Sequence, residues 1–477
     1  MSHYPSNSVS NKQSQNLLFR KGTLGLQKVA LFLGISMSVA APAGAAVKAT
    51  PYTEFVKALN LIDQTQLINF IDETPPSKEV VIEDYESRVR SVESKLDKTA
   101  PDYKTKSEEK RVEIMREVLA ETIELYNDKY ANYINPEALK KYNARRNGNF
   151  VGVGLKFKAV TDDYPIAIGA ITGGPMDGKD ILPADQLISV DDKSLKALSS
   201  NDVVAALKGP KGSTVTLKVR RDGTTHEVKV KRSAIELHYA DFELLDDGIG
   251  YIKISRFGSK THKRVEKMLK QLLSQDAKGF ILDLRDNPGG STRAARAIVS
   301  MFSAEQDIYR ERYKSGATKP LPRHGKHLTN LPLAVLINGK SMSSSEIVAG
   351  AIQSYNRGII IGSTSFGKGL VQKVFNLEAP LGGAVRTTIA MFGTPDHQWI
   401  HETGIVPDVF IETDSDFMYR RVGSLNIAKN ARAFQRTLLE QDVRKKHPER
   451  ADEFIAAKDL QLETAIKKLR QSANSTQ

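Results

Sequence analysis

Two short segments hold the residue types that suit nucleophilic chemistry. Hydroxyl side chains crowd residues 341–345, between an apolar run typical of a strand and one typical of a helix. Lys368 lies between two glycines, about one strand–helix–strand unit further along. A serine and a neutral lysine brought to one place can act as nucleophile and base without a histidine. The pattern therefore suggests a serine–lysine catalytic pair.

Each segment also has a purely structural interpretation. Serines before a helix commonly cap its N-terminus, and a lysine flanked by glycines suits a surface turn. A free lysine has a pKa near 10.4, so a general base must be buried enough to lose roughly three pKa units. The flanking glycines would allow a close approach, and Phe366 would supply apolar surroundings. Taken alone, neither segment decides between the two interpretations.

Other kinds of site match the sequence less well. Residues 362–369 have the spacing of a phosphate-binding loop, but Gly369 stands where a Mg²⁺-binding Ser or Thr is needed and a strand is predicted to follow. His397 and His401 lie near carboxylates, which leaves a histidine base as an alternative, although there is no G-x-S-x-G elbow. The remaining histidines lack metal-ligand spacing, so neither a metal nor another cofactor is predicted.

An alternation of strands and helices should position these residues. Residues 238–412 alternate in this way, which predicts an α/β layer with its site at the carboxyl ends of the strands. The expected elements are strands at 250–254, 280–284, 333–337 and 358–361 and helices at 262–273, 291–301 and 346–354. The turn 287–290, Asn-Pro-Gly-Gly, follows a buried strand. It is either an ordinary tight turn or a loop whose N–H groups point into a site.

The flanking regions have different patterns. Residues 46–148 are predicted to be helical, and residues 413–477 are charged and helix-prone. Residues 150–232 lie between the N-terminal helical region and the α/β layer. They contain short strands separated by glycines, with a hairpin turn at 221–223. In the helical region we expect a helix that begins at Ser107 and buries one stripe, formed by Val112, Met115, Leu119, Ile123 and Tyr126.

The N-terminus has the features of a secretory signal peptide. Residues 1–28 contain basic residues and no acid, 29–40 are apolar, and Ala43-Gly44-Ala45 forms an A-x-A cleavage site. The apolar run is shorter than the roughly 20 residues that a membrane span needs. We therefore expect an exported, periplasmic protein cleaved near Ala45, with an uncleaved membrane anchor as the alternative.

Composition excludes several classes of function. The 477 residues include no cysteine, which rules out disulfides, thiolate metal sites and cysteine catalysis. The net charge is +13, but lysines and arginines are mixed with acids. No nucleic-acid-binding motif accompanies the charge, so a solvated surface is favoured over a nucleic-acid partner.

Four ordered motifs together resemble those of the C-terminal processing peptidases, or tail-specific proteases, of the serine–lysine type (peptidase family S41). The resemblance covers roughly residues 125–412. The motifs are DLRDNPGG at 283–290, SMSSSEIVA at 341–349, TSFGKGLVQ at 364–372 and GIVPD at 404–408. Met342 and Ser344 replace alanines of the family pattern, and Asp396-His397 replaces its Ser-Gly.

The resemblance implies a role for each matching residue. Ser343 would be the nucleophile, Lys368 the general base and Gln372 the residue that orients the lysine. The backbone N–H groups of Gly289 and Ser344 would form the oxyanion hole. On a strand, residues 368 and 372 share a face, which is compatible with that role.

The resemblance also implies the architecture: an α/β multidomain chain with a crotonase-like (ββα) peptidase core and an inserted PDZ domain. We expect a signal peptide at 1–45, a helical N-terminal region at 46–148, the PDZ domain at 149–235, the peptidase core at 236–412 and a helical C-terminal region at 413–477. The PDZ loop, formed by Val151, Gly152, Val153 and Gly154, would hold a substrate's C-terminal carboxylate while the peptide adds as a strand.

The expected function is therefore that of a periplasmic serine endopeptidase that binds proteins by their C-termini and cleaves near them. By analogy alone, the helical ends imply an adaptor protein or a homo-oligomer. The alternative from another class is a non-catalytic PDZ scaffold that binds protein C-termini, which would have no need of Ser343 or Lys368.

Overall fold

The computed structural model describes residues 50–65, 77–126, 128–147, 149–245, 248–412 and 459–474, together with isolated positions between 434 and 452. The predicted signal peptide and most of the predicted C-terminal region before 459 lie outside the described residues. None of the described helices has both the length and the apolar character needed to cross a bilayer.

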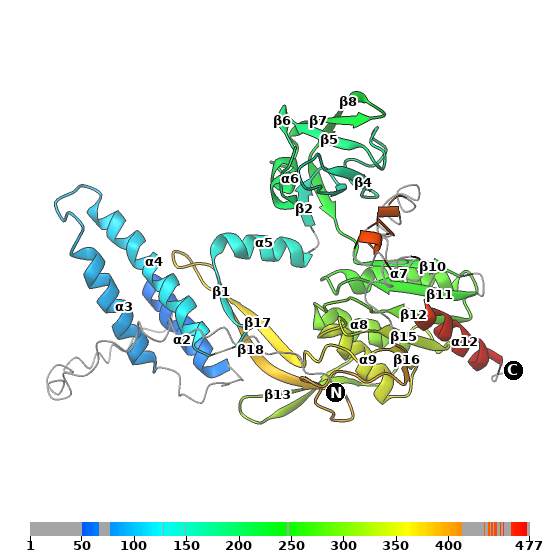
Figure 1. Ribbon diagram of the computed structural model, residues 1–477. Coiled ribbons are helices and arrows are strands. Elements are labelled where there is room, and N and C mark those ends of the chain that lie inside the picture. The colour runs from blue at the N-terminus through cyan, green and yellow to red at the C-terminus, as the bar shows by residue number, and fades with distance from the viewer. Residues whose placement is uncertain are drawn as a thin grey trace. The chain divides into compact units, whose positions relative to one another are not determined.

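A six-stranded sheet forms the centre of the α/β layer (Figure 1). Its last four neighbouring pairs are all parallel, and only the first pair is antiparallel. In spatial order the strands are β10 (Ala240–Leu244), β11 (Ile249–Ile254), β12 (Gly279–Asp283), β15 (Leu333–Ile337), β16 (Ile359–Gly362) and β19 (Val409–Phe410). The predicted strands and helices of this layer are confirmed, with ends that differ by a few residues.

Helices cover both faces of this sheet because alternate strand residues point to opposite sides. One face packs against α7 (Thr261–Leu273), α8 (Thr292–Phe302) and α9 (Ser344–Ser354) through strand residues that include Leu282 and Val335. The other face packs against α12 (Leu460–Asn474) through residues that include Ile281 and Leu336. The strands are therefore buried on both sides, as is usual for parallel sheets.

A second, five-stranded sheet positions the lysine segment. Its longest strand is β18, which pairs with β1, β13 and β17, while β14 pairs with β13. The bounds are β1 (Asn132–Ile134), β13 (Asp307–Tyr313), β14 (Thr318–Pro322), β17 (Leu370–Asn376) and β18 (Ala384–Gly393). Lys368 thus lies two residues before β17.

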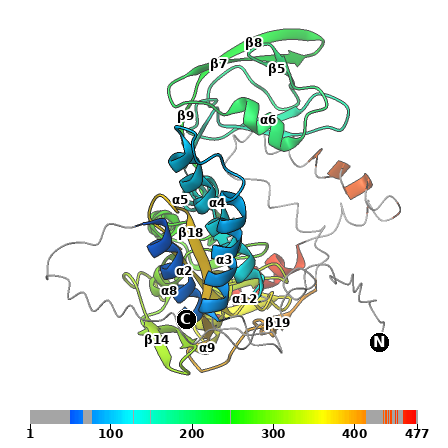
Figure 2. The same cartoon turned by 90° about the vertical axis from the view of Figure 1, so that its left-hand side faces the viewer.

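Three N-terminal helices pack against one end of the β17–β18 ribbon. They are α2 (Pro51–Thr65), α3 (Lys78–Glu93) and α4 (Tyr103–Glu124), and Figure 2 shows α3 beside α4. Their apolar core includes Leu377 and Leu381 of the β17–β18 connection and Val385 of β18. The whole stripe predicted for the helical region is buried, which confirms it. The predicted helix start was wrong, because α4 begins at Tyr103 and the Ser107 hydroxyl donates to Glu93 Oε1 at 2.6 Å.

The glycine-rich region forms a separate sheet. Its strand order is β3-β4-β5-β7-β8, with the short β6 beside β5. The elements are β3 (Leu155–Lys158), β4 (Ile166–Ala170), β5 (Gln186–Val190), β6 (Lys193–Ser194), α6 (Ser200–Leu207), β7 (Thr214–Arg221) and β8 (Thr224–Lys231). Asp222 and Gly223 both have positive φ, so the predicted hairpin turn is confirmed. Strand β3 lies at an edge of this sheet.

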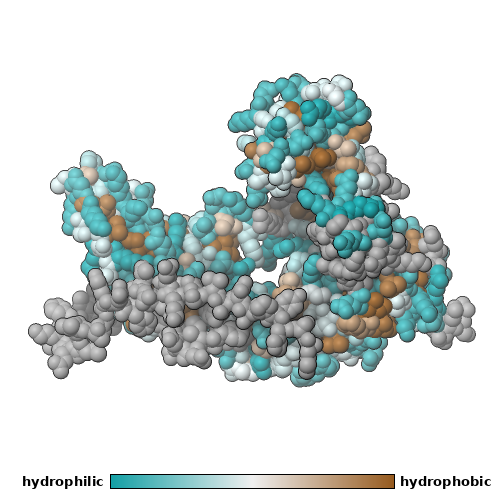
Figure 3. Space-filling view, viewed as in Figure 1, coloured by the Kyte–Doolittle hydropathy of each residue, from teal (hydrophilic) through white to brown (hydrophobic). Residues whose placement is uncertain are grey.

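The remaining elements join these parts. Helix α5 (Pro136–Asn147) precedes β2 (Asn149–Gly152), and β2 pairs with β9 (Ser233–Glu236). The architecture confirms the predicted α/β fold with helical flanking regions. On the face seen in Figure 3, the described residues are mostly hydrophilic, as expected from the mixed charges.

Candidate active site

Ser343 lies in the connection from β15 to α9 and has an unusual backbone conformation. Its φ is +58° and its ψ is −114°, a region that L-residues rarely occupy. Such conformations persist only where surrounding structure imposes them, and they cluster at functional sites. The turn also puts Ser343 immediately before the N-terminus of α9, where the helix dipole favours negative charge.

The three neighbouring serines hold this connection against the turn that follows β12. Each hydroxyl donates to a backbone carbonyl of residues 284–290: Ser341 to Leu284 at 2.9 Å, Ser345 to Asn287 at 2.9 Å and Ser344 to Gly290 at 3.1 Å. These contacts are structural. They distinguish the three serines from Ser343, which alone among the four has the strained backbone.

Lys368 is held by groups from two other segments. Its Nζ donates to Gln372 Oε1 at 2.8 Å and lies 4.5 Å from the centre of the Tyr130 ring. Gln372 Nε2 in turn donates to Thr388 Oγ1 of β18 at 3.1 Å. The sequence-based prediction that Gln372 contacts the lysine is thus matched by the geometry.

The surroundings of Lys368 favour its neutral form. Burial, assisted by the positive charge of Arg386, lowers the pKa of Lys368 to about 8, while Asp128 and Glu346 oppose the shift. At pH 7 about one lysine in ten would then be neutral, compared with fewer than one in a thousand for a free lysine. The pKa of Lys368 is therefore lowered as a general base requires, although the side chain is only partly buried and Phe366, expected to supply apolar surroundings, is exposed.

Glu346 links the serine turn to the lysine segment. The side chain is buried, and its two carboxylate oxygens accept four hydrogen bonds. The donors are Ser343 N at 2.7 Å, Ser365 Oγ at 2.6 Å, Gly367 N at 2.6 Å and Lys368 N at 2.9 Å. Burial raises the pKa of Glu346, and these donors act against that rise. One side chain therefore fixes the backbones of both proposed catalytic residues.

The hydrogen bonds of the described residues include none between Ser343 and Lys368. The lysine ammonium instead contacts Gln372 and Tyr130. Catalytic hydrogen bonds are often long before substrate binds. The structure therefore shows both residues held in adjoining segments, with the lysine directed to Gln372.

The Gly289-Gly290 turn packs directly on the serine turn. A Cβ built on Gly289 would lie 2.6 Å from Met342 O and 2.9 Å from Ser344 N, so the two predicted oxyanion donors belong to touching segments. However, Gly289 N–H donates to Asn287 Oδ1 at 2.9 Å. Among the described hydrogen bonds, none uses the N–H groups of Gly290 or Ser344. Of the two glycines, Gly290 is thus the one whose N–H group has no acceptor among the described hydrogen bonds, while Gly289 is the one in contact with the serine turn.

The predicted alternatives have different geometry. His401 Nδ1 lies 3.3 Å from Gly367 O, and no hydrogen bond joins His397 or His401 to Ser343 within the described chain. Residues 362–369 lead into strand β17, not into the helix that a phosphate loop requires. Across the described residues, no cluster of three or more His, Asp or Glu side chains could hold a metal ion.

The predicted carboxylate-binding residues lie where the β2–β9 ladder meets the glycine-rich sheet. Val151 and Gly152 belong to β2, and Val153 and Gly154 connect it to the edge strand β3. Gly154 has a φ of +74° and a built Cβ would lie 3.1 Å from Pro175 Cδ, so glycine is required there.

Sequence reasoning missed Tyr130, Arg386 and the bridging role of Glu346. Glu346 belongs to the serine motif, but its partners lie on a segment that only the fold brings near. Tyr130 and Arg386 carry no motif of their own. The contact of Tyr130 with Lys368 and the effect of the Arg386 charge on its pKa depend on β17 pairing with β18 and β18 with β1.

Comparisons with known proteins identify the family of the chain. Residues 248–411 match the family model for peptidase family S41, and residues 144–220 match the PDZ domain model. The carboxyl-terminal-processing protease of Synechocystis sp. (strain ATCC 27184 / PCC 6803 / Kazusa) is 32% identical over 301 residues, which are 62% of this chain and 70% of the relative. That of Picosynechococcus sp. (strain ATCC 27264 / PCC 7002 / PR-6) is 33% identical over 61% of this chain and 72% of the relative.

Among solved structures, the photosystem II D1 C-terminal processing protease matches with a TM-score of 0.46 and 23% identity over 76% of this chain and 94% of that chain. The family models and relatives define a serine-type peptidase that contains a PDZ domain. The chain belongs to the carboxyl-terminal-processing proteases of peptidase family S41.

Proposed function

We propose that Ser343 is the nucleophile of this peptidase and Lys368 its general base, positioned by Gln372. The observation that carries the proposal is the partly buried Lys368, which contacts Gln372 and whose backbone is tied by Glu346 to that of Ser343, together with its pKa of about 8. Membership of the family supports cleavage of proteins near their C-termini. No observation favours the alternative of a non-catalytic scaffold.

In the proposed reaction, the neutral Lys368 amine turns from Gln372 toward Ser343 and accepts the hydroxyl proton. Ser343 Oγ forms a bond to the scissile carbonyl carbon, and the peptide C–N bond breaks as Lys368 returns the proton to the leaving amine. Water then attacks the acyl-enzyme and gives a proton to Lys368, which restores it to Ser343 Oγ as the new carboxyl group leaves. The reaction needs no metal ion or organic cofactor.

The negative charge that develops on the carbonyl oxygen needs backbone donors. We propose the N–H groups of Ser344 and Gly290 for this role. The sequence-based prediction chose Gly289 of the pair, but the Gly289 N–H group is engaged by Asn287 Oδ1. The Ser344 donor lies at the N-terminus of α9, where the helix dipole adds to the stabilisation.

Recognition of the substrate is proposed to use the PDZ domain. Strand β3 lies at the edge of its sheet, so its backbone can accept an added peptide strand. The substrate carboxylate would be bound by the backbone of Val151, Gly152, Val153 and Gly154. The inactive Ser343→Ala enzyme should bind a peptide with a free C-terminal carboxylate more tightly than the same peptide amidated, and equal affinities would contradict carboxylate capture.

Export to the periplasm is proposed from the N-terminal sequence alone. The basic segment, the apolar run and the Ala43-Gly44-Ala45 site support it. Fractionation of cells and mass spectrometry of the mature N-terminus test it. A mature chain that begins near Ala46 is expected, and an intact chain in the cytosol would contradict it.

Two variants test the catalytic pair on an unfolded protein with an apolar C-terminus. Ser343→Ala should abolish cleavage, and Lys368→Arg should do so too, since arginine stays protonated. Lys340→Met, which alters an exposed lysine beside the serine turn, is the matched control and should retain full activity. Cleavage by Ser343→Ala would refute the serine assignment. Activity of Lys368→Arg at neutral pH would favour a histidine base.

A further inference from the structure

A cluster of buried charged side chains lies next to residues 287–290, which form the oxyanion turn of the proposed site. Asp283, at the end of β12, is fully buried and accepts hydrogen bonds from Tyr251 Oη at 2.6 Å and from Lys253 Nζ at 3.0 Å. Lys253 Nζ also donates to Arg285 O at 2.7 Å. Burial raises the pKa of Asp283, but the charges of Arg285 and Lys253 outweigh burial and hold that pKa well below its usual range.

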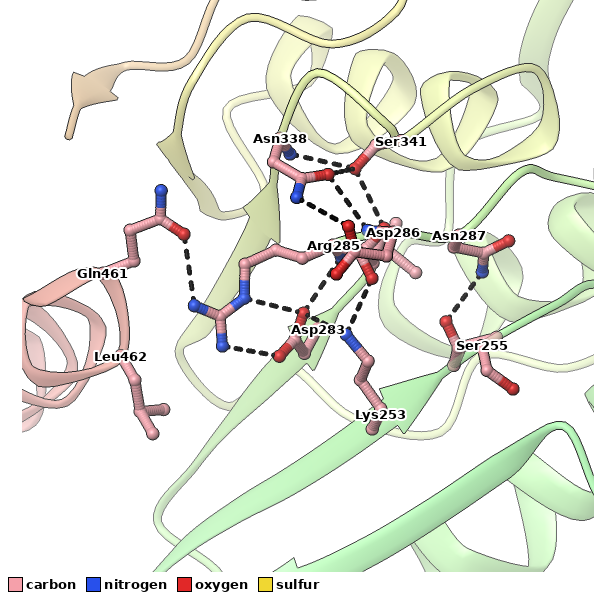
Figure 4. A network of polar contacts seen from close by, with 12 residues as sticks. Lys253, Ser255, Asp283, Arg285, Asp286, Asn287, Asn338, Ser341, Gln461 and Leu462 are labelled. Carbon is pink, nitrogen blue, oxygen red and sulfur yellow. Dashed lines mark hydrogen bonds and ion pairs between the residues drawn. The ribbon is translucent and has the colours of Figure 1, made fainter. Parts of the chain in front are cut away.

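The Arg285 guanidinium connects this cluster to the C-terminal helix (Figure 4). The side chain is 1% exposed, and all five of its N–H donors have acceptors. Asp283 accepts from Nε and Nη2, and the other three bonds go to Asp459 Oδ1 at 2.8 Å, Asp459 Oδ2 at 2.9 Å and Gln461 Oε1 at 3.1 Å. The C-terminal segment, 174 positions along the chain, thus supplies most of the partners of this buried cation.

Helix α12 is built to hold these acceptors in place. Asp459 also accepts from Leu462 N at 3.1 Å, which caps the helix. Gln461 Nε2 donates to Ile411 O at 2.7 Å, just after β19. Leu462, Ala465 and Leu469 bury the apolar face of α12 on the sheet. Both acceptors therefore reach Arg285 only while α12 is docked.

The backbone after Arg285 continues directly into the oxyanion turn at residues 287–290. Asp286 N donates to Asn338 Oδ1 at 3.0 Å, and Asn287 O accepts from Met342 N at 3.0 Å, beside Ser343. Gly289 and Gly290 follow two and three residues later. A shift of Arg285 would therefore displace the turn that supplies an oxyanion donor and supports the serine turn.

We propose that α12 is a positioning element of the active site, in which Asp459 and Gln461 complete the donor set of Arg285 and thereby fix the oxyanion turn. This inference rests on the proposed function of that turn. Without α12, three N–H donors of a buried cation lose their partners, and the guanidinium must move to regain water or another acceptor. Docking of the C-terminal helix thus controls the rate of the chemical step and leaves capture of the substrate tail to the PDZ domain.

The test compares Asp459→Asn with Glu463→Gln, which removes an exposed carboxylate from the next turn of the same helix. With a peptide substrate, Asp459→Asn should lower kcat about 10- to 100-fold, the range expected for small displacements in an active site. Asp459→Glu, which keeps the charge, should restore part of that loss, and Glu463→Gln should behave as wild type. Tail-peptide affinity, measured in the Ser343→Ala background, should be unchanged.

Thermal unfolding reports whether each variant is folded. A folded Asp459→Asn enzyme with kcat within twofold of wild type would overturn the inference. If Asp459→Asn does not fold, Gln461→Ala decides, because it removes no charge: a several-fold loss of kcat supports the inference, and an unchanged kcat overturns it. In every case Ser343→Ala tests the proposed function separately, since cleavage by that variant would refute the function whatever Asp459 does.

Discussion

Replacing Arg386 by methionine should move the pH dependence of the enzyme to higher pH. Burial and the positive charge of Arg386 lower the pKa of Lys368 to about 8. Arg386 Nε is itself buried and has no hydrogen-bond partner among the described residues. Methionine keeps much of the side-chain volume and removes the charge.

The size of the effect follows from the neutral fraction of Lys368. With a pKa of about 8, that fraction is about 1% at pH 6, about 9% at pH 7 and half at pH 8. Since only the neutral amine can accept the serine proton, kcat/KM should rise about tenfold from pH 6 to pH 7 and about fivefold from pH 7 to pH 8, and it should level off above about pH 9. For each unit by which Arg386→Met raises the pKa of Lys368, kcat/KM at pH 7 should fall about tenfold, and the plateau at high pH should stay unchanged.

The assay is kcat/KM for a quenched fluorescent peptide with a free C-terminus, measured from pH 5.5 to 10.5. Arg386→Lys is the control, because it keeps the charge and should therefore keep the rising limb of the kcat/KM pH profile near pH 8. Asp128→Asn should move the limb the other way, since Asp128 raises the pKa of Lys368. A limb that stays in place in both charge-removing variants would refute the reasoning. So would a loss of activity by the same factor at every pH.

Three further predictions concern the same site. Lys368→Met should raise the free energy of unfolding at pH 7 by about 1–3 kcal/mol, because a partly buried ammonium is replaced by an apolar group. In wild type the cost of the ammonium falls as pH rises from about 8 toward the pKa of the unfolded state. A lower melting temperature of the variant at pH 7 would count against this prediction. Gly289→Ala should abolish cleavage and destabilise the fold by about 1–3 kcal/mol in urea unfolding. The reason is that Gly289 has a φ of +87° and that the new Cβ would lie 2.6 Å from Met342 O. Wild-type kinetics of this variant would show that the turn is not constrained. Glu346→Gln should lose about 2–4 kcal/mol of stability and most of kcat, because the NH2 group of the glutamine side chain would face backbone N–H donors. An active variant of unchanged stability would contradict the bridging role of Glu346.

Patterns local in sequence predicted much of the fold. The buried stripe from Val112 to Tyr126 and the Asp222-Gly223 hairpin both follow from short-range periodicity and turn chemistry. The start of α4 was misjudged because Ser107 has the side chain of a cap, yet its hydroxyl bonds to Glu93 on another helix. Such a tertiary contact leaves no trace in the neighbouring residues.

In the candidate site, too, some features could be predicted from the sequence and others depend on tertiary contacts. The order strand, serines, helix places Ser343 at a helix N-terminus. The contact between Lys368 and Gln372 was expected from the family resemblance, with both residues on one strand face, but only Gln372 belongs to β17, because the strand begins at Leu370. The groups that set the pKa of Lys368, Arg386 and Asp128, come from segments far apart in sequence. The hydrogen bond from Gly289 N–H to Asn287 Oδ1, on which the proposal of Gly290 rests, is a contact that no sequence pattern reveals.

The most direct test of the central claim is to identify the residue that carries the acyl group. An activated peptide ester, which acylates quickly, should make the acyl-enzyme accumulate; acid quenching, digestion and mass spectrometry then locate it. We predict the adduct on Ser343 in wild type, and none on Ser341, Ser344 or Ser345. An adduct on one of those three hydroxyls, or turnover of the ester by Ser343→Ala at the wild-type rate, would contradict the account.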